Sequence, residues 1–244
     1  MRARLDTCLV RLGLAASREN AQRLILAGCV RVNGETARKP SDKVSETASI
    51  HVVATERFVG RGGYKLEAAL TAFGISCAGA VCLDIGASTG GFTDCLLQHG
   101  ARRVHAVDVG KGQLAWRLCT DPRVIVHDGL NARYLGFEDI GETVDLVAID
   151  VSFISLTKVL PAAVGLLKSG GVVVSLIKPQ FEAGRKDVKK GGVVRDYSVH
   201  ERVKTQVARF ALDALGLQAL GEMIESPLLG PAGNKEFLAA WRKP

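Results

Sequence analysis

The sequence predicts an α/β domain built on a mostly parallel sheet, preceded by a small α+β domain. From residue 64 onward, helical and strand patterns alternate, which is typical of a parallel sheet covered on both faces. Before it, two short apolar helical patterns lead into short strands around the turn signal Asn33-Gly34. A glycine-rich, charged stretch, Arg57 to Gly63, separates the two patterns. We therefore expect domains over residues 1–60 and 61–244.

In the first domain, one helix opens at Leu5 and stops at Gly13, and Ser17 caps a second helix that ends at Gly28. In the second domain, helices are expected to begin near Gly91, Gly112 and Ser155, with a last helix over residues 199–215. Residues 217–225 and 236–241 are expected to pair at one edge, which gives seven strands. The other five expected strands of the second domain are Val81–Ile85, Val104–Val109, Val124–Val126, Val144–Ile149 and Val172–Ile177, and those of the first domain are Val30–Val32 and Ile50–Val53.

Composition and charge favour a folded protein and argue against several classes of protein and site. The 244 residues are 47% apolar, enough for a substantial core, and the formal charge is +7. Residues 1–60 are the basic end, with ten lysines and arginines against six acidic residues. The first residues lack the apolar run of a secretory signal, and charges interrupt the most apolar stretch, so we expect a cytoplasmic protein with no membrane partner. Six scattered cysteines without a CxxC pair argue against metal and disulfides. We expect a monomer.

The first strand-to-helix turn of the second domain, Asp84-Ile85-Gly86-Ala87-Ser88-Thr89-Gly90-Gly91-Phe92, is a candidate cofactor loop. Its spacing does not fit the dinucleotide pattern G-x-G-x-x-G, which disfavours a nucleotide-dependent oxidoreductase. The loop resembles the first motif of class I S-adenosylmethionine methyltransferases, in which it wraps the methionine part of the cofactor. A simple tight turn remains the alternative.

Two further acids follow successive strands. Asp108 ends the second strand, where a carboxylate can accept hydrogen bonds from ribose hydroxyls, and Asp128 follows the third, placed for an adenine amino group. Either acid taken singly is more often a cap or turn residue. The expected cofactor is S-adenosylmethionine, and its expected site is Asp84, Gly86, Ser88, Thr89, Gly90, Gly91, Asp108 and Asp128.

The string RLDTCLVRLGLAASRENAQRLILAGCVRVNGETARKPS closely resembles the small RNA-binding domain named after ribosomal protein S four. The resemblance implies that Arg18, Gln22 and Arg23 face structured RNA. Lys39 follows the turn of this domain, and Arg185 and Lys186 lie in a second basic run after residue 178; such groups suit a phosphate backbone. A solvated surface or a mobile loop is the alternative for each.

After the fourth strand comes Asp150-Val151-Ser152-Phe153, which lacks the Asn-Pro-Pro-Tyr of enzymes that methylate amino groups. No cysteine lies in a Pro-Cys setting, so a covalent thiol mechanism is unsupported. Attention moves to lysines: Lys65 opens the second domain and Lys178 follows the fifth strand. A lysine ending an apolar strand is usually a surface group.

The motifs RGGYKL, DIGASTGGFTD, AIDVSF, LIKPQFE and GNKEF, in that order after an S4-like domain, resemble the TlyA group of FtsJ-like RNA ribose methyltransferases, a group also called hemolysins. The resemblance implies a Rossmann-like class I methyltransferase fold, a Lys65-Asp150-Lys178-Glu236 catalytic tetrad, and cytidine ribose in ribosomal RNA or ribosomal subunits as substrate. Two alternatives remain: an RNA-binding assembly factor that has lost its activity, and, ranked last, a membrane-damaging hemolysin.

Overall fold

The computed structural model describes residues 2–26, 28–45, 47–53, 57–184, 186–188, 191–230 and 232–244. Contacts divide the chain into two compact units, residues 1–57 and 58–244. Phe58 is 1% exposed and packs edge-on against Tyr64, so it belongs to the core of the second unit. The division falls there, beside the boundary expected near residue 60.

The N-terminal unit packs two helices, α1 (Leu5–Arg11) and α2 (Arg18–Leu26), around a core that contains Leu5, Leu9 and Ile25. The helices and the Asn33-Gly34 turn agree with the expectations, and both turn residues have positive φ. The sequence did not reveal strands at Arg2–Arg4 and Lys43–Ser45, because neither has the apolar–polar–apolar alternation of Val30–Val32 and Ile50–Val52. The strands are β1 (Arg2–Arg4), paired with β4 (Lys43–Ser45), and β2 (Val30–Val32), paired with β3 (Glu35–Thr36) and β5 (Ile50–Val52).

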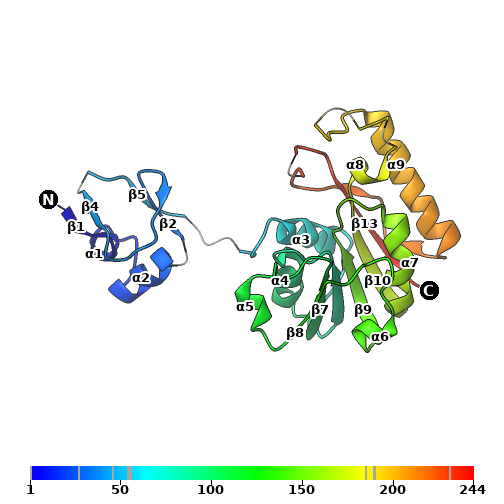
Figure 1. Ribbon diagram of the computed structural model, residues 1–244, viewed down its shortest axis with the longest axis horizontal. Helices are drawn as coiled ribbons and strands as arrows, with labels where there is room; N and C mark the ends of the chain where they lie inside the picture. Colours follow the sequence, from blue (N-terminus) through cyan, green and yellow to red (C-terminus); the bar gives the residue numbers. More distant parts are fainter. Residues whose placement is uncertain are drawn as a thin grey trace. The chain divides into compact units, whose positions relative to one another are not determined.

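The second unit is an eight-stranded sheet between helices (Figure 1). Its strand order is β11-β13-β10-β9-β6-β7-β8, with β12 also paired to β13. The five strands from β10 to β8 run parallel, and β13 is antiparallel to β10. The strands are β6 (Val81–Ile85), β7 (Arg103–Asp108), β8 (Val124–Asp128), β9 (Val144–Ile149), β10 (Leu167–Ile177), β11 (Gln218–Ala219), β12 (Ile224–Glu225) and β13 (Phe237–Arg242).

Alternate residues of each strand enter two separate cores, as the two-residue period of a strand requires. Leu83 and Val147 contribute to one core, whereas Cys82 and Leu146 contribute to the other. The first core contains residues of α7 (Leu156–Leu166) and α9 (Tyr197–Arg209); the second contains residues of α3 (Gly62–Ala72) and α4 (Gly91–Gln98). Figure 1 shows these helix pairs on opposite faces, which confirms the expected covered sheet.

Two expectations about elements were wrong. The helix expected near Gly112 begins later, as α5 (Trp116–Cys119), because Gly112 takes a left-handed φ of 64° that no helix continues. Residues 217–225 form two short strands rather than one, so the sheet has eight strands and not seven. The remaining short helices are α6 (Phe137–Ile140), α8 (Pro179–Glu182) and a π-helical end to α9 (Phe210–Ala214). Within the described residues, no helix is both long and apolar enough to cross a membrane.

Candidate active site

The strand order reverses between β6 and β9, and a cleft of about 650 Å³ lies at their carboxyl ends. The chain passes from β6 outward to β7 and β8, then returns to β9 on the other side of β6. Ligands of open α/β sheets bind at such a switch. Gly86, Asp108 and Asp150, each directly after or ending a strand, all line this cleft.

The glycine loop is fitted closely against the neighbouring strand end. Gly86 has φ 88°, and a Cβ there would lie 2.3 Å from the carbonyl oxygen of Asp150, so only glycine fits. Ser88 also takes a left-handed φ of 49°. Thr89 accepts a hydrogen bond from the backbone of Ala115, and Gly91 opens α4. Gly86 therefore brings backbone without a side chain to the cleft, which Ser88 also lines.

Asp84 is completely buried beneath this loop. Its Oδ2 accepts hydrogen bonds from the backbone nitrogen and the hydroxyl of Thr93, at 2.8 and 2.7 Å. Its Oδ1 is buried without a hydrogen-bond partner among the described residues. Burial raises the pKa of Asp84 to about 7, and the Thr93 hydroxyl opposes that rise. An unpartnered buried carboxylate oxygen is a place where a cationic ligand is stabilised.

Asp108 and Asp128 both bind backbone in the loops that border the cleft. Asp108 accepts from the nitrogens of Ser88 (2.8 Å) and Gly110 (2.7 Å), so it ties the glycine loop to the end of β7. Asp128 accepts from the nitrogen of Gly112 at 2.8 Å and is exposed outside the residues that line the cleft. The structural role that the sequence left open is thus real for both; each carboxylate oxygen retains further acceptor capacity.

The four candidate catalytic residues form two ion pairs. Lys178 Nζ lies 2.5 Å from Asp150 Oδ1, and Lys65 Nζ lies 2.5 Å from Glu236 Oε2. The Lys65–Glu236 pair is buried, whereas the side chains of Lys178 and Asp150 are 11% and 22% exposed. Glu236 Oε1 is buried with no hydrogen-bond partner among the described residues. One pair is therefore enclosed and the other borders the cleft.

Sheet register brings these residues together from distant parts of the chain. Ile177 pairs with Phe237, so Lys178 and Glu236 are the next residues beyond the paired ends of β10 and β13. Asp150 follows the neighbouring strand β9. Lys65 comes from α3, and a Cβ on Gly62, at the start of that helix, would lie 3.8 Å from Asp150 Oδ2. The snorkelling surface role considered for Lys178 does not fit a lysine bound to Asp150.

Two residues of this site were missed at the sequence level. Ser152 Oγ accepts a hydrogen bond from Lys178 Nζ at 3.0 Å. Phe153 is 91% exposed, lines the cleft, has a left-handed φ of 64° and lies 5.0 Å from the ring of Phe181. Exposure, backbone strain and its place in the lining of the cleft together make Phe153 a candidate functional residue. Only its position after a strand end signalled this in the sequence.

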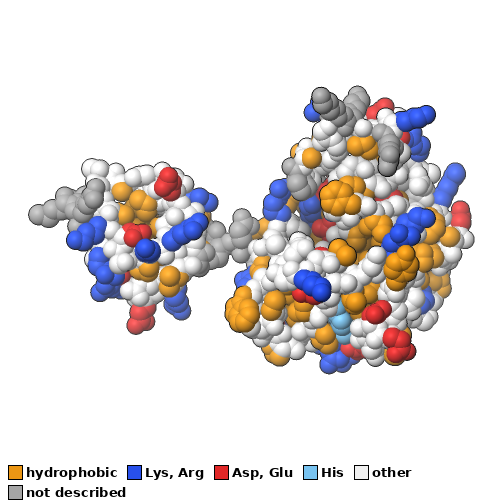
Figure 2. Space-filling view, in the orientation of Figure 1, with side chains coloured by type: hydrophobic (Ala, Val, Ile, Leu, Met, Phe, Trp, Pro, Cys, Tyr) orange, Lys and Arg blue, Asp and Glu red, His pale blue; other side chains and the backbone are white. Residues whose placement is uncertain are grey.

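The candidate RNA-binding residues of the N-terminal unit differ in their hydrogen bonding and exposure. Arg18 and Gln22 both donate to the buried carboxylate of Asp6, at 3.0 and 3.1 Å. Arg4, Gln22 and Arg18 hold the pKa of Asp6 well below its usual range. Figure 2 shows lysine and arginine side chains on the visible face of this unit. Arg23 and Lys39 are exposed, so part of the set is fixed by Asp6 and part is free to reach solvent.

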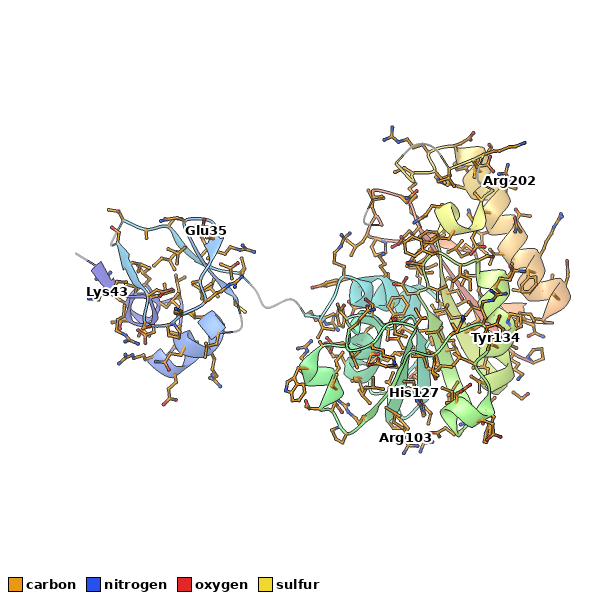
Figure 3. The ribbon with its side chains drawn as sticks, in the orientation of Figure 1. Glu35, Lys43, Arg103, His127, Tyr134 and Arg202 are labelled. Atoms are coloured by element: carbon orange, nitrogen blue, oxygen red, sulfur yellow. The ribbon has the colours of Figure 1, made fainter. Side chains whose placement is uncertain are left out.

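The second basic run is partly described. Lys186 is exposed, and Arg185 lies outside the described residues. Asp187, next in the chain, accepts a 2.5 Å bond from Arg202 of α9, the arginine labelled in Figure 3. This ion pair links the described part of the run to α9. No group of three or more metal-ligating side chains occurs in the described part of the chain.

Comparison with known proteins agrees with this geometry. Residues 58–243 match the model of the FtsJ-like methyltransferases, and residues 3–50 match the S4 domain. The chain is 53% identical over 238 residues to the 16S/23S rRNA (cytidine-2'-O)-methyltransferase TlyA of Mycobacterium tuberculosis, covering 97% of this chain and 88% of that protein.

Two further proteins are similar along nearly the whole chain. Hemolysin A of Brachyspira hyodysenteriae is 45% identical, with 97% of this chain and 98% of that protein covered. A solved structure from Streptococcus thermophilus, described as a hemolysin, is 44% identical with a TM-score of 0.75, covering 99% of this chain and 88% of that one. The chain belongs to the FtsJ-like methyltransferase family and carries an S4 domain at its N-terminus.

Proposed function

We propose that this protein transfers a methyl group from S-adenosylmethionine to the 2'-oxygen of a cytidine ribose in ribosomal RNA. The observation that carries the proposal is the Lys178–Asp150 ion pair at the edge of the cleft, beside the glycine loop. The similarity to a 16S/23S rRNA (cytidine-2'-O)-methyltransferase supports the choice of substrate.

The residues at the strand ends fit the cofactor by their chemistry. Asp84 offers a buried carboxylate with an unpartnered oxygen to the positive charge of the methionine part. The loop around Gly86 admits a ligand close to the backbone, and Asp108 lines the cleft with acceptors for ribose hydroxyls. When bound, S-adenosylmethionine supplies an electrophilic methyl group on a sulfonium, a good leaving group.

Lys178 is the residue placed to take the proton of the ribose hydroxyl. Bound S-adenosylmethionine would supply the methyl group and leave as the thioether, while Lys178 Nζ would take up the proton that the 2'-hydroxyl loses. Asp150 and Ser152 fix that nitrogen through contacts of 2.5 and 3.0 Å. Such positioning and proton transfer are the main contributions a protein can make here, because the leaving group needs no further activation.

The buried Lys65–Glu236 pair supports the site from behind. Its pairing neutralises two charges that would be costly to bury separately. The exposed ring of Phe153 gives the target base a surface on which to stack. In this proposal Lys65, Asp150, Lys178 and Glu236 act as one unit.

The N-terminal unit and the basic loop supply docking to RNA in this proposal. Arg23, Lys39 and Lys186 are exposed cations suited to phosphate contacts, and Arg18 and Gln22 present a surface ordered by Asp6. Arg185 belongs to the same proposed run.

Replacement of Lys178 tests the proposal. Lys178→Ala should lower the single-turnover rate of methyl transfer by about 10²- to 10⁴-fold, the usual contribution of a general base, while cofactor and RNA affinities remain. Lys178→Arg should not restore the rate, because a guanidinium stays protonated. Near-normal transfer by a folded Lys178→Ala protein would remove Lys178 as the base.

A further inference from the structure

Contacts at three places join the loop after β9 to the segment after β10. Lys178 binds Asp150 and Ser152 at one end, and the Phe181 ring packs against Phe153 in the middle. At the other end Glu182, the last residue of α8, binds the start of α7. The two segments are thus joined along their length, with the ion pair of the reaction at one end and Glu182 at the other.

Glu182 makes two short hydrogen bonds to α7. Its Oε2 accepts from the hydroxyl of Ser155 at 2.5 Å, and its Oε1 accepts from the backbone nitrogen of Leu156 at 2.7 Å. Ser155 is the N-cap of α7, so the carboxylate caps this helix from a neighbouring segment and lies at its positive end. Both carboxylate oxygens of Glu182 accept a bond, so the two bonds fix the orientation of the carboxylate as well as its distance from α7.

The loop between these anchors is strained. Phe153 holds φ at 64° although it has a side chain, a strained conformation that persists only where the surroundings impose it. The contacts that border it are the Lys178–Asp150 pair before it and the Glu182 bonds after it. Releasing the second anchor lets residues 150–155 relax.

We infer that Glu182 is a positioning residue for methyl transfer: by fixing the start of α7, it holds Asp150, Ser152 and Phe153 in register with Lys178. Glu182 touches none of the reacting groups and acts through this loop. The inference rests on the proposed function, since it concerns the geometry of the same site.

Two substitutions separate hydrogen bonding from charge. Glu182→Ala removes both acceptors. Glu182→Gln keeps an acceptor for the Leu156 N–H and gives a donor to Ser155 Oγ, which can still donate to Thr157 Oγ1, 2.9 Å away. The glutamine variant therefore preserves the two bonds without the charge. If position is what matters, glutamine should rescue what alanine loses.

Asp145 provides a matched control. Like Glu182, it accepts one backbone N–H, from Val81 at 2.8 Å, and one side-chain donor, Lys168 at 2.6 Å. It lies at the amino end of β9, the opposite end of that strand from Asp150. Asp145→Ala therefore loses comparable bonds without loosening the loop.

The test measures single-turnover methyl transfer to ribosomal subunits, S-adenosylmethionine affinity by calorimetry and thermal unfolding for all four proteins. Glu182→Ala should lose about 10- to 100-fold in rate, as a displacement of order 1 Å produces, with cofactor affinity unchanged. Glu182→Gln and Asp145→Ala should stay near the wild-type rate.

Three results would overturn the inference: a wild-type rate for Glu182→Ala, an equal loss in Glu182→Gln, or an equal loss in Asp145→Ala. An inactive wild-type protein would instead refute the proposed function. The two failures are therefore distinguishable.

Discussion

Asp84 makes a quantitative prediction about pH and cofactor binding. In the folded protein, burial raises the pKa of this carboxyl from 3.8 to about 7. S-adenosylmethionine carries positive charge at its sulfonium and ammonium, so its binding at the proposed site favours ionised Asp84. The ionised fraction rises from about one tenth at pH 6 to about nine tenths at pH 8, so affinity should rise about tenfold over that range.

Calorimetric titration at pH 6, 7 and 8 measures this effect. Asp84→Asn keeps an acceptor for Thr93 but cannot ionise. Its affinity for S-adenosylmethionine should therefore be lower than that of the wild type at pH 8, and it should lack the rise that ionisation of Asp84 produces between pH 6 and 8. Methylthioadenosine lacks the amino-acid group and the positive sulfur, and should show no rise with the wild-type protein. An equal pH dependence in Asp84→Asn, or none in the wild type, would refute the reasoning.

The same pKa fixes the sign of a stability effect. Between pH 4 and 7 the unfolded chain ionises Asp84 while the folded chain keeps it protonated. The unfolded state is therefore stabilised relative to the folded state, and the free energy of unfolding falls as pH rises. The pKa shift corresponds to about 4 kcal/mol of unfolding free energy. This amount is lost between pH 4 and 7, and the loss stays constant above pH 7. Denaturant unfolding of the wild type and Asp84→Asn should differ by this slope; parallel curves would contradict the buried, raised carboxyl.

Three further predictions concern the cofactor loop and RNA docking. Asp108→Ala should weaken S-adenosylmethionine binding by about 1–3 kcal/mol by calorimetry, because backbone N–H groups and ribose hydroxyls lose their acceptor; wild-type affinity in a folded variant would reject this placement. Gly86→Ala should abolish detectable cofactor binding, because its Cβ would lie 2.3 Å from the carbonyl oxygen of Asp150; unchanged binding would show that the loop moves freely. Deleting residues 1–57 should leave cofactor binding intact but lower methylation of ribosomal subunits. For the full chain, a plot of log RNA affinity against log salt concentration should fall with a slope of about one unit per neutralised phosphate. Equal methylation by the truncated protein would exclude a docking role for these residues.

Local sequence patterns were enough to place the main strands and the candidate functional residues that follow them. Val81–Ile85 and Val144–Ile149 match β6 and β9 because each is a continuous apolar run ended by a turn. Gly86 and Asp150 could be located for the same reason, since a functional residue in this fold follows a strand. The motifs, rather than the periodicity, indicated that Lys65 and Glu236 belong to the same site.

Other features depend on tertiary contacts that no local pattern encodes. The left-handed Phe153 and the Glu182 bonds to α7 arise where two strand ends meet, 27 residues apart in the case of Ser155 and Glu182. Gly112 was expected to open a helix, but its nitrogen binds Asp128, 16 residues away. Arg18 and Gln22 were expected to face RNA, and pairing with Asp6 was not evident from their spacing.

The central claim is that this chain methylates a cytidine 2'-oxygen in ribosomal RNA. The most direct measurement incubates the purified protein with labelled S-adenosylmethionine and separated ribosomal subunits, then maps the modified nucleotide by nuclease digestion and mass spectrometry. We expect label in 2'-O-methylcytidine, formed by the wild type and lost in Lys178→Ala. Label on a base, or no label in either subunit, would contradict it.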